Sequence, residues 1–471
     1  MRRSSPWLGI VAALGVACSS SEDPAAKAPA DAGADTGQAL GWAPGTVYPT
    51  PRAPGPRGWL DRRGLVHAHS VYSHDACDGE PKNDAGEIDG ECLDDFRRDV
   101  CTVQHDFVML SDHRESFAST EYPETLLYRP ARGDTLVERG GGPVASRLAC
   151  PESDPVLVMA GCESGTMPVG LERHVETPTT RGDVYGASTP EAIATLKAAG
   201  AIVLVAHTED WTPEQLTTLP LDGFEMYNLH ANLFANVGAA LGLLTKLTQP
   251  ELLPHPDLIL LPLISEDPRY LETWGTVLAG GARRVTTVGT DCHRNSFPQL
   301  LPDGERVDSY RRMMGWFSNH VLVRPRADGT WTDLELKEGL AAGRLYGAFE
   351  VLGFPVGFDF HATAGEIHEM GEEVSLASTP ELVVHLPSVQ ELGAGTPAPE
   401  LTARILLARE GGWDEVHSSQ EDTSFRPTLP GAYRAEIRMR PRHLAPHLSS
   451  YASLAEGDFV WIYSNPIYLV P

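Results

Sequence analysis

The stretch Gly64-Leu65-Val66-His67-Ala68-His69 sets the pattern of the whole chain, because a short apolar run ends in two histidines one residue apart. The apolar run predicts a buried strand. Side chains alternate along an extended backbone, so His67 and His69 should point to the same side. We therefore expect a strand whose C-terminal end presents a pair of metal ligands.

Six more short apolar or β-branched runs follow along the chain, and segments with the periodicity of amphipathic helices lie between them. The runs are 106–110, 156–159, 201–205, 224–227, 285–288 and 321–323, and the helical segments are 92–105, 190–199 and 267–278. This alternation predicts a parallel α/β architecture. Together with the run at 64–66, it predicts a seven-stranded α/β barrel over residues 59–350.

The pattern changes after about residue 350, where apolar and polar residues alternate between Gly and Pro turns. The alternating stretches are 381–386, 403–407, 433–438 and 460–463. They predict a C-terminal antiparallel β domain of the sandwich type over residues 351–471.

The charge balance of 37 basic and 64 acidic residues gives a net charge of −27. Such a charge repels nucleic acid phosphates, so we expect no nucleic acid partner and instead a small-molecule substrate. A substrate anion would need metal ions or a local arginine to hold it.

The N-terminus begins with Met1-Arg2-Arg3 and an apolar run from Trp7 to Ala17 that is too short to cross a bilayer. This predicts an export signal over residues 1–18. Leu14-Gly15-Val16-Ala17-Cys18 resembles a bacterial lipobox, which implies lipidation of Cys18 and a membrane anchor on the periplasmic or cell-surface side; plain secretion is the alternative. Residues 19–58 are rich in Ala, Pro, Gly and Asp, and they predict a flexible linker.

Six cysteines follow Cys18, an even number in a chain predicted to be exported. Cys77, Cys92, Cys101 and Cys150 lie in loop-rich sequence and are the candidates for disulfides. Cys162 and Cys292 each lie beside a candidate metal ligand, and strand alternation should point both away from it. We expect these two to be buried free thiols.

Metal-ligand residues follow five of the seven runs. They are His67 and His69, Asp112 and His113, Glu163, His207, and Asp291 with His293. The C-terminal strand ends of a parallel barrel open onto one face, so these side chains should meet there. Any one of these histidines alone would more often be a core or surface residue. Together, imidazoles and carboxylates predict a site for two or three divalent ions, Zn, Mn or Fe.

The ordered motifs of residues 60–350 resemble those of the polymerase and histidinol phosphatase (PHP) superfamily. They are Val66–His69, Ser73-His74-Asp75, Leu110–His113, Gly161–Glu163, Ala206-His207 and Gly289–His293. The resemblance implies a distorted seven-stranded barrel and a phosphoesterase with two or three metal ions. Motifs at 349–353, 431–434 and 461–468 are similar to the β appendage of the CehA/McbA branch, which is named for hydrolysis of a carbamate ester.

The same resemblance implies three ligand sets. The first metal would take His67, His69, Glu163 and Asp291. The second would share Glu163 and add His174 and His207. The third would take His113 and His293 with either His74 or Asp75, because the family's usual Ser-Asp-Gly is Ser-His-Asp here.

Asp112, His113, Glu163 and His207 are the candidate catalytic residues. Asp112 could orient an imidazole, take part in proton transfer or be merely structural. Glu225 in the fifth run, and Asn228 and His230 after it, could line the pocket, although helix capping and surface exposure explain them as well. Arg294 could hold a substrate anion or be an ordinary surface charge.

These features predict a metal-dependent hydrolase of phosphate mono- or diesters that uses metal-bound hydroxide as the nucleophile. One alternative is a carboxylic or carbamate ester hydrolase of the CehA type. Another is a non-catalytic surface-binding lipoprotein. A phosphatase should place a basic side chain in the pocket, whereas a carbamate hydrolase should have an apolar, aromatic pocket.

Overall fold

The structure is a computed structural model that describes residues 41–471, apart from residues 56 and 177–178 and several side chains between 233 and 244. Residues 41–471 form one compact unit. The predicted export signal, Cys18 and residues 19–40 of the predicted linker lie outside the described residues. In the described part of the chain, no helix has both the length and the hydropathy needed to cross a membrane.

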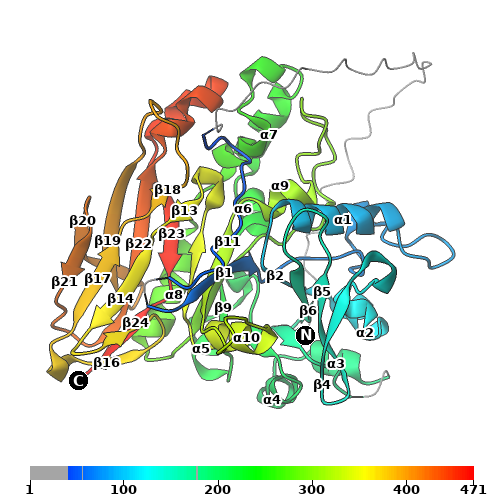
Figure 1. Ribbon diagram of the computed structural model, residues 1–471, viewed down its shortest axis with the longest axis horizontal. Helices are drawn as coiled ribbons and strands as arrows, with labels where there is room; N and C mark the ends of the chain where they lie inside the picture. The colour runs from blue at the N-terminus through cyan, green and yellow to red at the C-terminus, as the bar shows by residue number, and fades with distance from the viewer. Residues whose placement is uncertain (1–40, 56, 177–178) are drawn as a thin grey trace. The chain divides into compact units, whose positions relative to one another are not determined.

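All seven predicted runs form strands in a mixed α/β fold (Figure 1). These are β1 (Leu60–Leu65), β2 (Phe107–Met109), β6 (Val156–Glu163), β8 (Ile202–Leu204), β9 (Gly223–Asn228), β10 (Val285–Gly289) and β11 (Ser318–Val323). The three predicted helical segments correspond to α1 (Gly90–Thr102), α4 (Pro190–Ala198) and α8 (Pro268–Ala279). Each helix begins after a polar side chain that accepts a hydrogen bond from a backbone N–H of its first turn.

Further elements of this region are short or partly exposed, so their sequence patterns are weak. The strands are β3 (Asp112–His113), β4 (Thr135–Arg139), β5 (Gly142–Leu148), β7 (Met167–Leu171) and β12 (Leu345–Ala348). The helices are α2 (Arg114–Ser119), α3 (Arg181–Tyr185), α5 (Pro213–Thr218), α6 (Leu229–Ala235), α7 (Val237–Lys246), α9 (Tyr310–Met314) and α10 (Asp333–Ala341).

The strand pairing is mixed rather than wholly parallel. β1 pairs in parallel with β2, and β2 with β6, whereas β7 is antiparallel to both β6 and β8. β9 and β10 form a parallel pair, and β11 runs antiparallel to β1. Backbone hydrogen bonds join the segment before β9 to β8 and the end of β10 to the end of β1, from Asp222 N to Val203 O (2.9 Å) and from Asp291 N to His67 O (3.3 Å). Taken in order, these contacts link β1 to β2, β6, β7, β8, β9 and β10, and the end of β10 to the end of β1.

Antiparallel strands dominate the C-terminal region. They include β14 (Asp359–Thr363), β15 (Ile367–His368), β17 (Glu381–His385), β19 (Glu400–Arg409), β20 (Gly412–Ser419), β21 (Thr423–Phe425), β22 (Gly431–Arg440), β23 (Phe459–Ser464) and β24 (Ile467–Val470), with the short strands β13 (Pro355–Val356) and β18 (Ser388–Val389). The short strand β16 (Glu373–Ser375) is instead parallel to β24. β19, β20, β22 and β23 lie side by side at the left of Figure 1. β15, β14, β17 and β21 form a separate four-stranded sheet.

The large sheet continues across the predicted boundary at residue 350, because β12 pairs with β23 from Tyr346–Ser464 to Ala348–Ile462. The first described residues also pack against this unit. Trp42 and Tyr48 are buried in its core, and Thr50 Oγ1 donates to Asp106 at 2.7 Å. Residues 41–50, predicted as part of the flexible linker, are therefore part of the folded unit.

Candidate metal centre

The ends of β1 and β10 place four predicted ligands on one side of the backbone. Ala68 and Cys292 form an isolated parallel bridge, and His69 N donates to Cys292 O at 3.1 Å. The bridge aligns the two motifs, so the residues that flank Ala68 face those that flank Cys292. His67 and His69 thus lie against Asp291 and His293.

The ends of β3 and β6 repeat this arrangement. Asp112 pairs with Cys162, and His113 pairs with Glu163 in a parallel register. Alternation then turns His113 and Glu163 toward the same side, and His113 Nδ1 lies 3.6 Å from Glu163 Oε2. Cys162 and Cys292 are both buried free thiols, as predicted.

Four ligands form the first cluster, which comprises His67, Glu163, His207 and Asp291. His67 Nε2 lies 3.4 Å from Glu163 Oε2 and 3.2 Å from Asp291 Oδ1. His207 Nε2 lies 3.0 Å from Glu163 Oε1 and 3.1 Å from Asp291 Oδ2. Both carboxylates therefore span the space between the two imidazoles, the arrangement that a cation needs.

The second cluster comprises His69, Asp75, His113 and His293. Asp75 Oδ2 lies 3.1 Å from His113 Nε2 and 3.3 Å from His293 Nε2. His69 Nε2 lies 3.1 Å from both Glu163 Oε2 and Asp291 Oδ1, so it joins this cluster to the first. His230 forms a third group with Asp291 and His293. Its Nδ1 lies 3.3 Å from Asp291 Oδ2.

The nitrogen and oxygen atoms that meet in the two clusters are mostly hydrogen-bond acceptors, so they suit a bound cation better than hydrogen bonds to one another. His67 Nδ1 lies 2.7 Å from Glu225 Oε1, and an ionised carboxylate can only accept, so the ring proton belongs on Nδ1. The lone pair of His67 Nε2 then faces His69 Nε2 at 3.1 Å and two carboxylates. Glu163 Oε2, Asp291 Oδ1 and His293 Nε2 are buried without a hydrogen-bond partner. Acceptors crowded in this way call for a positive charge between them.

The close contacts between imidazoles and carboxylates also shift the pKa values of these groups. Burial opposes a charge on His67, but Glu225, Asp291 and Glu163 outweigh burial and raise its pKa well above the usual value. Burial likewise opposes charge on Glu163 and Asp291, yet nearby imidazoles lower the pKa of both carboxyls well below their usual range. Burial and the neighbouring His293 lower the pKa of His69 to about 4. In the absence of an ion, the carboxylates would draw protons onto some of these rings, and a divalent cation competes for the same positions.

Backbone strain is also concentrated at this centre. His207 has φ 52° and Asp291 has φ 54°, in the left-handed region that residues other than glycine adopt at a cost. His207 follows the end of β8, and its N–H lies 3.4 Å from Glu225 Oε2 as a donor. The fully buried Glu225 thus contacts two ligands, His67 through its ring and His207 through its backbone.

Glu225, predicted only to line the pocket, instead contacts two candidate ligands directly. An acidic side chain within an apolar strand run was the sequence signal for it. Asn228 Nδ2 donates to Glu225 Oε2 at 3.1 Å and lies 3.5 Å from Asp291 Oδ2, so Asn228 also borders the centre. Glu209, which the sequence analysis did not select, lies 3.5 Å from His207 Nδ1 and accepts from the Tyr270 hydroxyl.

Asp75, not His74, is the member of the third predicted set that joins the cluster. His74 is exposed and lies outside it, although its ring centroid is 5.0 Å from that of His113. Asp112 does not orient an imidazole, because both of its oxygens accept from Ser70, from N at 2.7 Å and from Oγ at 2.8 Å. Burial raises the pKa of Asp112 to about 6, although these two hydrogen bonds oppose the rise.

Two other predicted residues have partners outside the clusters. His174 is placed with Glu163 and His207 by the family resemblance, but its Nδ1 lies 2.8 Å from the Tyr185 hydroxyl and its Nε2 lies 2.8 Å from Thr120 O. Both ring nitrogens are therefore occupied. Arg294 Nη2 pairs with Asp95 on α1 at 3.2 Å, so its charge is directed toward that helix.

A cavity of about 40 Å³ adjoins the first cluster beyond Glu209 and Asn228. Tyr227, Tyr270, Leu271 and Tyr463 are among its lining residues. Tyr463 belongs to β23, so the C-terminal region contributes to the lining of this cavity. The Tyr463 hydroxyl donates to Glu266. The space accommodates water molecules next to the ligands.

Comparisons with protein-family models, curated proteins and solved structures find no match for this chain.

Proposed function

We propose that this protein is a metal-dependent hydrolase of ester bonds, with phosphate mono- or diesters as the preferred substrate class. The observation that carries the proposal is the adjacency of two four-residue ligand clusters, connected through His69 and through the carboxylates of Glu163 and Asp291. Eight ligands from separate segments of the chain meet in one buried centre, and a purely structural site rarely needs so many. The ring of strand contacts around β1 is consistent with the PHP-type barrel that we propose for residues 59–350.

The two clusters would each hold one divalent ion, Zn, Mn or Fe. Bound divalent ions would supply a hydrolytic nucleophile by lowering the pKa of water and would stabilise negative charge on the ester oxygens. The chain's own residues hold the ligand atoms in place. Glu225 keeps the His67 proton on Nδ1, and Asp112 holds Ser70 in the loop that follows His69.

Carboxylic or carbamate ester hydrolysis is the second candidate, and the surroundings of the centre favour it over phosphate esters in one respect. Arg294, the predicted anion-binding residue, is paired with Asp95. Tyrosine and apolar side chains make up half of the lining of the adjoining cavity, and polar or charged side chains make up the other half; Arg269, the basic residue among them, pairs with Asp267. We retain phosphate esters first because divalent ions can themselves hold a phosphoryl group. Export and a lipid anchor at Cys18 complete the proposal.

Elemental mass spectrometry of protein purified without chelators and supplied with Mn²⁺ or Zn²⁺ tests the metal centre. We expect two ions per chain, and their loss in the His67→Ala, Asp291→Ala double variant. The exposed His385→Ala variant is the matched control and should keep both ions. Fewer than one ion per chain in the unaltered protein would refute the metal centre and favour a binding protein.

Turnover of nitrophenyl phosphate, a nitrophenyl phosphodiester, a nitrophenyl acetate and a nitrophenyl carbamate should be measured on the same preparations. Hydrolysis of one class that disappears with the ions identifies the ester. Full metal occupancy without turnover of any of the four would contradict the ester hydrolase proposal while leaving the metal centre intact.

A further inference from the structure

Asp75 differs from the other ligands of the second cluster because it lies in a loop rather than next to a strand end. The loop continues into a single turn at Cys77–Gly79, and Asp75 is the only carboxylate of its cluster. Its side chain is 34% exposed, compared with 26% for His113, 5% for His293 and 0% for His69. The position of this loop therefore decides whether the second cluster is complete.

Noncovalent contacts hold the loop, among them the Arg306–Asp78 ion pair and the hydrogen bond from Ser73 Oγ to Asp75 Oδ1 at 3.0 Å. Cys77 N donates to His293 O at 3.1 Å, and Asp78 N donates to Arg294 O at 3.0 Å. Asn295 Nδ2 donates to Asp75 O at 2.8 Å. Cys77 and Asp78 have φ values of 56° and 60°, a left-handed conformation that favours glycine. Cys77 and Asp78 therefore have a backbone conformation that residues other than glycine adopt at a cost.

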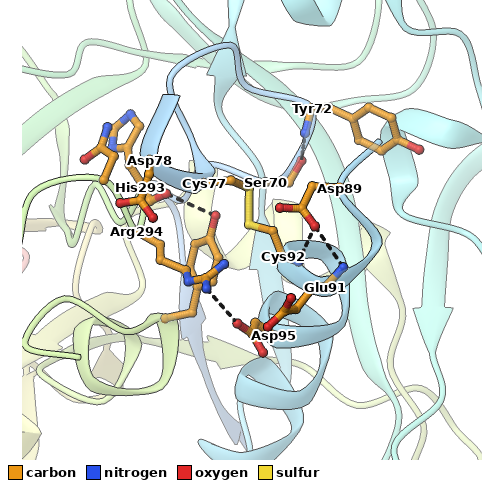
Figure 2. The surroundings of a disulfide bond; sticks show 12 residues. Ser70, Tyr72, Cys77, Asp78, Asp89, Glu91, Cys92, Asp95, His293 and Arg294 are labelled. Atoms are coloured by element: carbon orange, nitrogen blue, oxygen red, sulfur yellow. Dashed lines mark hydrogen bonds and ion pairs between the residues drawn. A yellow bond between two sulfur atoms is a disulfide. The ribbon is translucent and has the colours of Figure 1, made fainter. Parts of the chain in front are cut away.

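A disulfide joins this strained position to α1 (Figure 2). Cys92 lies in the first turn of the helix and is fully buried, and the intervening residues 83–87 are exposed. Asp89 caps the same turn by accepting from Glu91 N and Cys92 N. Arg294 pairs with Asp95 one turn further along, so α1 is connected to two of the segments that supply the second cluster, the Asp75 loop and the segment that contains His293.

We infer that the Cys77–Cys92 disulfide positions Asp75, so that the second metal ion is bound more tightly while this bridge is oxidised. The inference rests on the proposed metal centre. The ligands of the first cluster come from the ends of β1, β6, β8 and β10, and none of them lies in the loop that is bridged to α1. Loss of the bridge should therefore weaken the binding of the second ion and leave the binding of the first unchanged. An exported protein would meet the oxidising conditions that such a bridge requires.

Stepwise metal binding by the full chain tests the inference, with Mn²⁺ as the probe and elemental mass spectrometry after equilibration with a graded chelator as the readout. In the Cys77→Ser, Cys92→Ser variant we expect the first ion to keep its affinity and the second to bind about 10-fold to 100-fold more weakly. Asp75→Asn should produce the same selective loss with the bridge intact. Combining the changes should add little, because both act on the same carboxylate.

The second disulfide of the molecule, Cys101–Cys150, supplies the matched control. Its Cys101→Ser, Cys150→Ser variant should keep both ions even if its melting temperature falls. Cys77→Ala, Cys92→Val fills the buried Cys92 position without sulfur and serves if the serine variant does not fold. Two ions of unchanged affinity in a folded bridge variant would overturn the inference alone, as would equal weakening of both ions. Absence of ions in the unaltered protein would instead remove the proposed function.

Discussion

At the scale of single residues, Glu225 orients the imidazole of His67, a candidate metal ligand. It is fully buried, and its Oε1 accepts from the protonated Nδ1 of His67, which leaves Nε2 with a free lone pair. A carboxylate in this position both orients an imidazole and increases its basicity. Glu225 therefore affects the first cluster without itself belonging to it.

The Glu225→Gln variant should bind its first ion about 10-fold to 100-fold more weakly, since the uncharged amide no longer holds the imidazole as a carboxylate does. Calorimetric titration with Mn²⁺ measures the change. Glu272→Gln, on the exposed face of α8, is the control of equal charge and should bind like the unaltered protein. An unchanged affinity for the Glu225→Gln variant would show that this hydrogen bond is not needed.

His320 provides a pH-dependent contribution to stability away from the metal centre. Its Nδ1 lies 2.9 Å from Asp61 Oδ1 and its Nε2 lies 3.3 Å from Glu350 Oε1, with the Tyr346 hydroxyl 3.1 Å from Nδ1. Burial opposes the charged form, but the two carboxylates outweigh burial and raise the pKa of His320 to about 9. Burial opposes charge on both carboxyls, but His320 lowers the pKa of Asp61, and Arg63 together with His320 lowers the pKa of Glu350.

The raised pKa means that the stabilising contribution of His320 is fully present below its unfolded pKa and is lost as pH rises through about 9. Its upper bound is about 3 kcal/mol. Urea unfolding at about pH 6 and about pH 10 should show the loss in the unaltered protein and a smaller loss in His320→Gln. The exposed His385→Gln is the control. Equal losses in all three proteins would rule out this role for His320.

At the scale of elements, the close packing of β9 against β10 brings the supporting carboxylate to the ligands. Gly289 ends β10, and a Cβ there would overlap the Glu225 carboxylate and lie 3.1 Å from His67 Cβ. The absence of a side chain at this position gives Glu225 room to reach His67. Neither strand could supply the contact alone.

Gly289→Ala should lower the free energy of unfolding by about 1–3 kcal/mol through overpacking and should weaken the first ion by displacing Glu225. Chemical denaturation and metal titration measure the two effects. Gly90→Ala is the comparison, because that position opens α1 and has no neighbour within 4 Å. It should leave stability unchanged or slightly higher. If Gly289→Ala has the stability and metal affinity of the unaltered protein, the contact between Glu225 and His67 does not depend on the absence of a side chain at residue 289.

At the scale of the whole molecule, several C-terminal strands belong to the same sheet as β1, β3, β6 and β8, four of the strands that lead to candidate ligands, whereas β10 pairs separately with β9. β12 pairs with β11 on one side and with β23 on the other. Arg434 of β22 is buried among three aromatic rings. Its Cζ lies 4.6 Å from the ring centroid of Trp274 on α8, 4.5 Å from that of Trp413 on β20 and 5.1 Å from that of Tyr463 on β23. These contacts bind α8 to the C-terminal strands.

Because the sheet and this aromatic cluster are shared, residues 41–471 should unfold in one cooperative transition. Differential scanning calorimetry of the ion-free protein is the measurement, and its calorimetric and van't Hoff enthalpies should agree. A chain ending at residue 350 should not fold, because β12 would lose its pairing with β23. Two separate transitions, or a stable truncated chain, would show that the regions are independent domains.

Much of the local structure followed from the sequence alone. The seven runs, the three helical segments and the ligands after five of the runs are all local patterns, in which apolar periodicity and residue type suffice. The sequence also indicated the four bridged cysteines and the two free thiols, although Cys92 and Cys101 lie in α1 and not in a loop.

Only the tertiary structure decided which of these residues meet. His174 resembles a ligand in order along the chain, yet Tyr185 and Thr120 occupy its ring. His74 and Asp75 are adjacent, and the fold of their loop decides that Asp75 turns toward His113 and His293. The pairing of β12 with β23 joins two regions that differ in sequence pattern. Such choices depend on contacts between residues far apart in the chain, whose energies no local pattern contains.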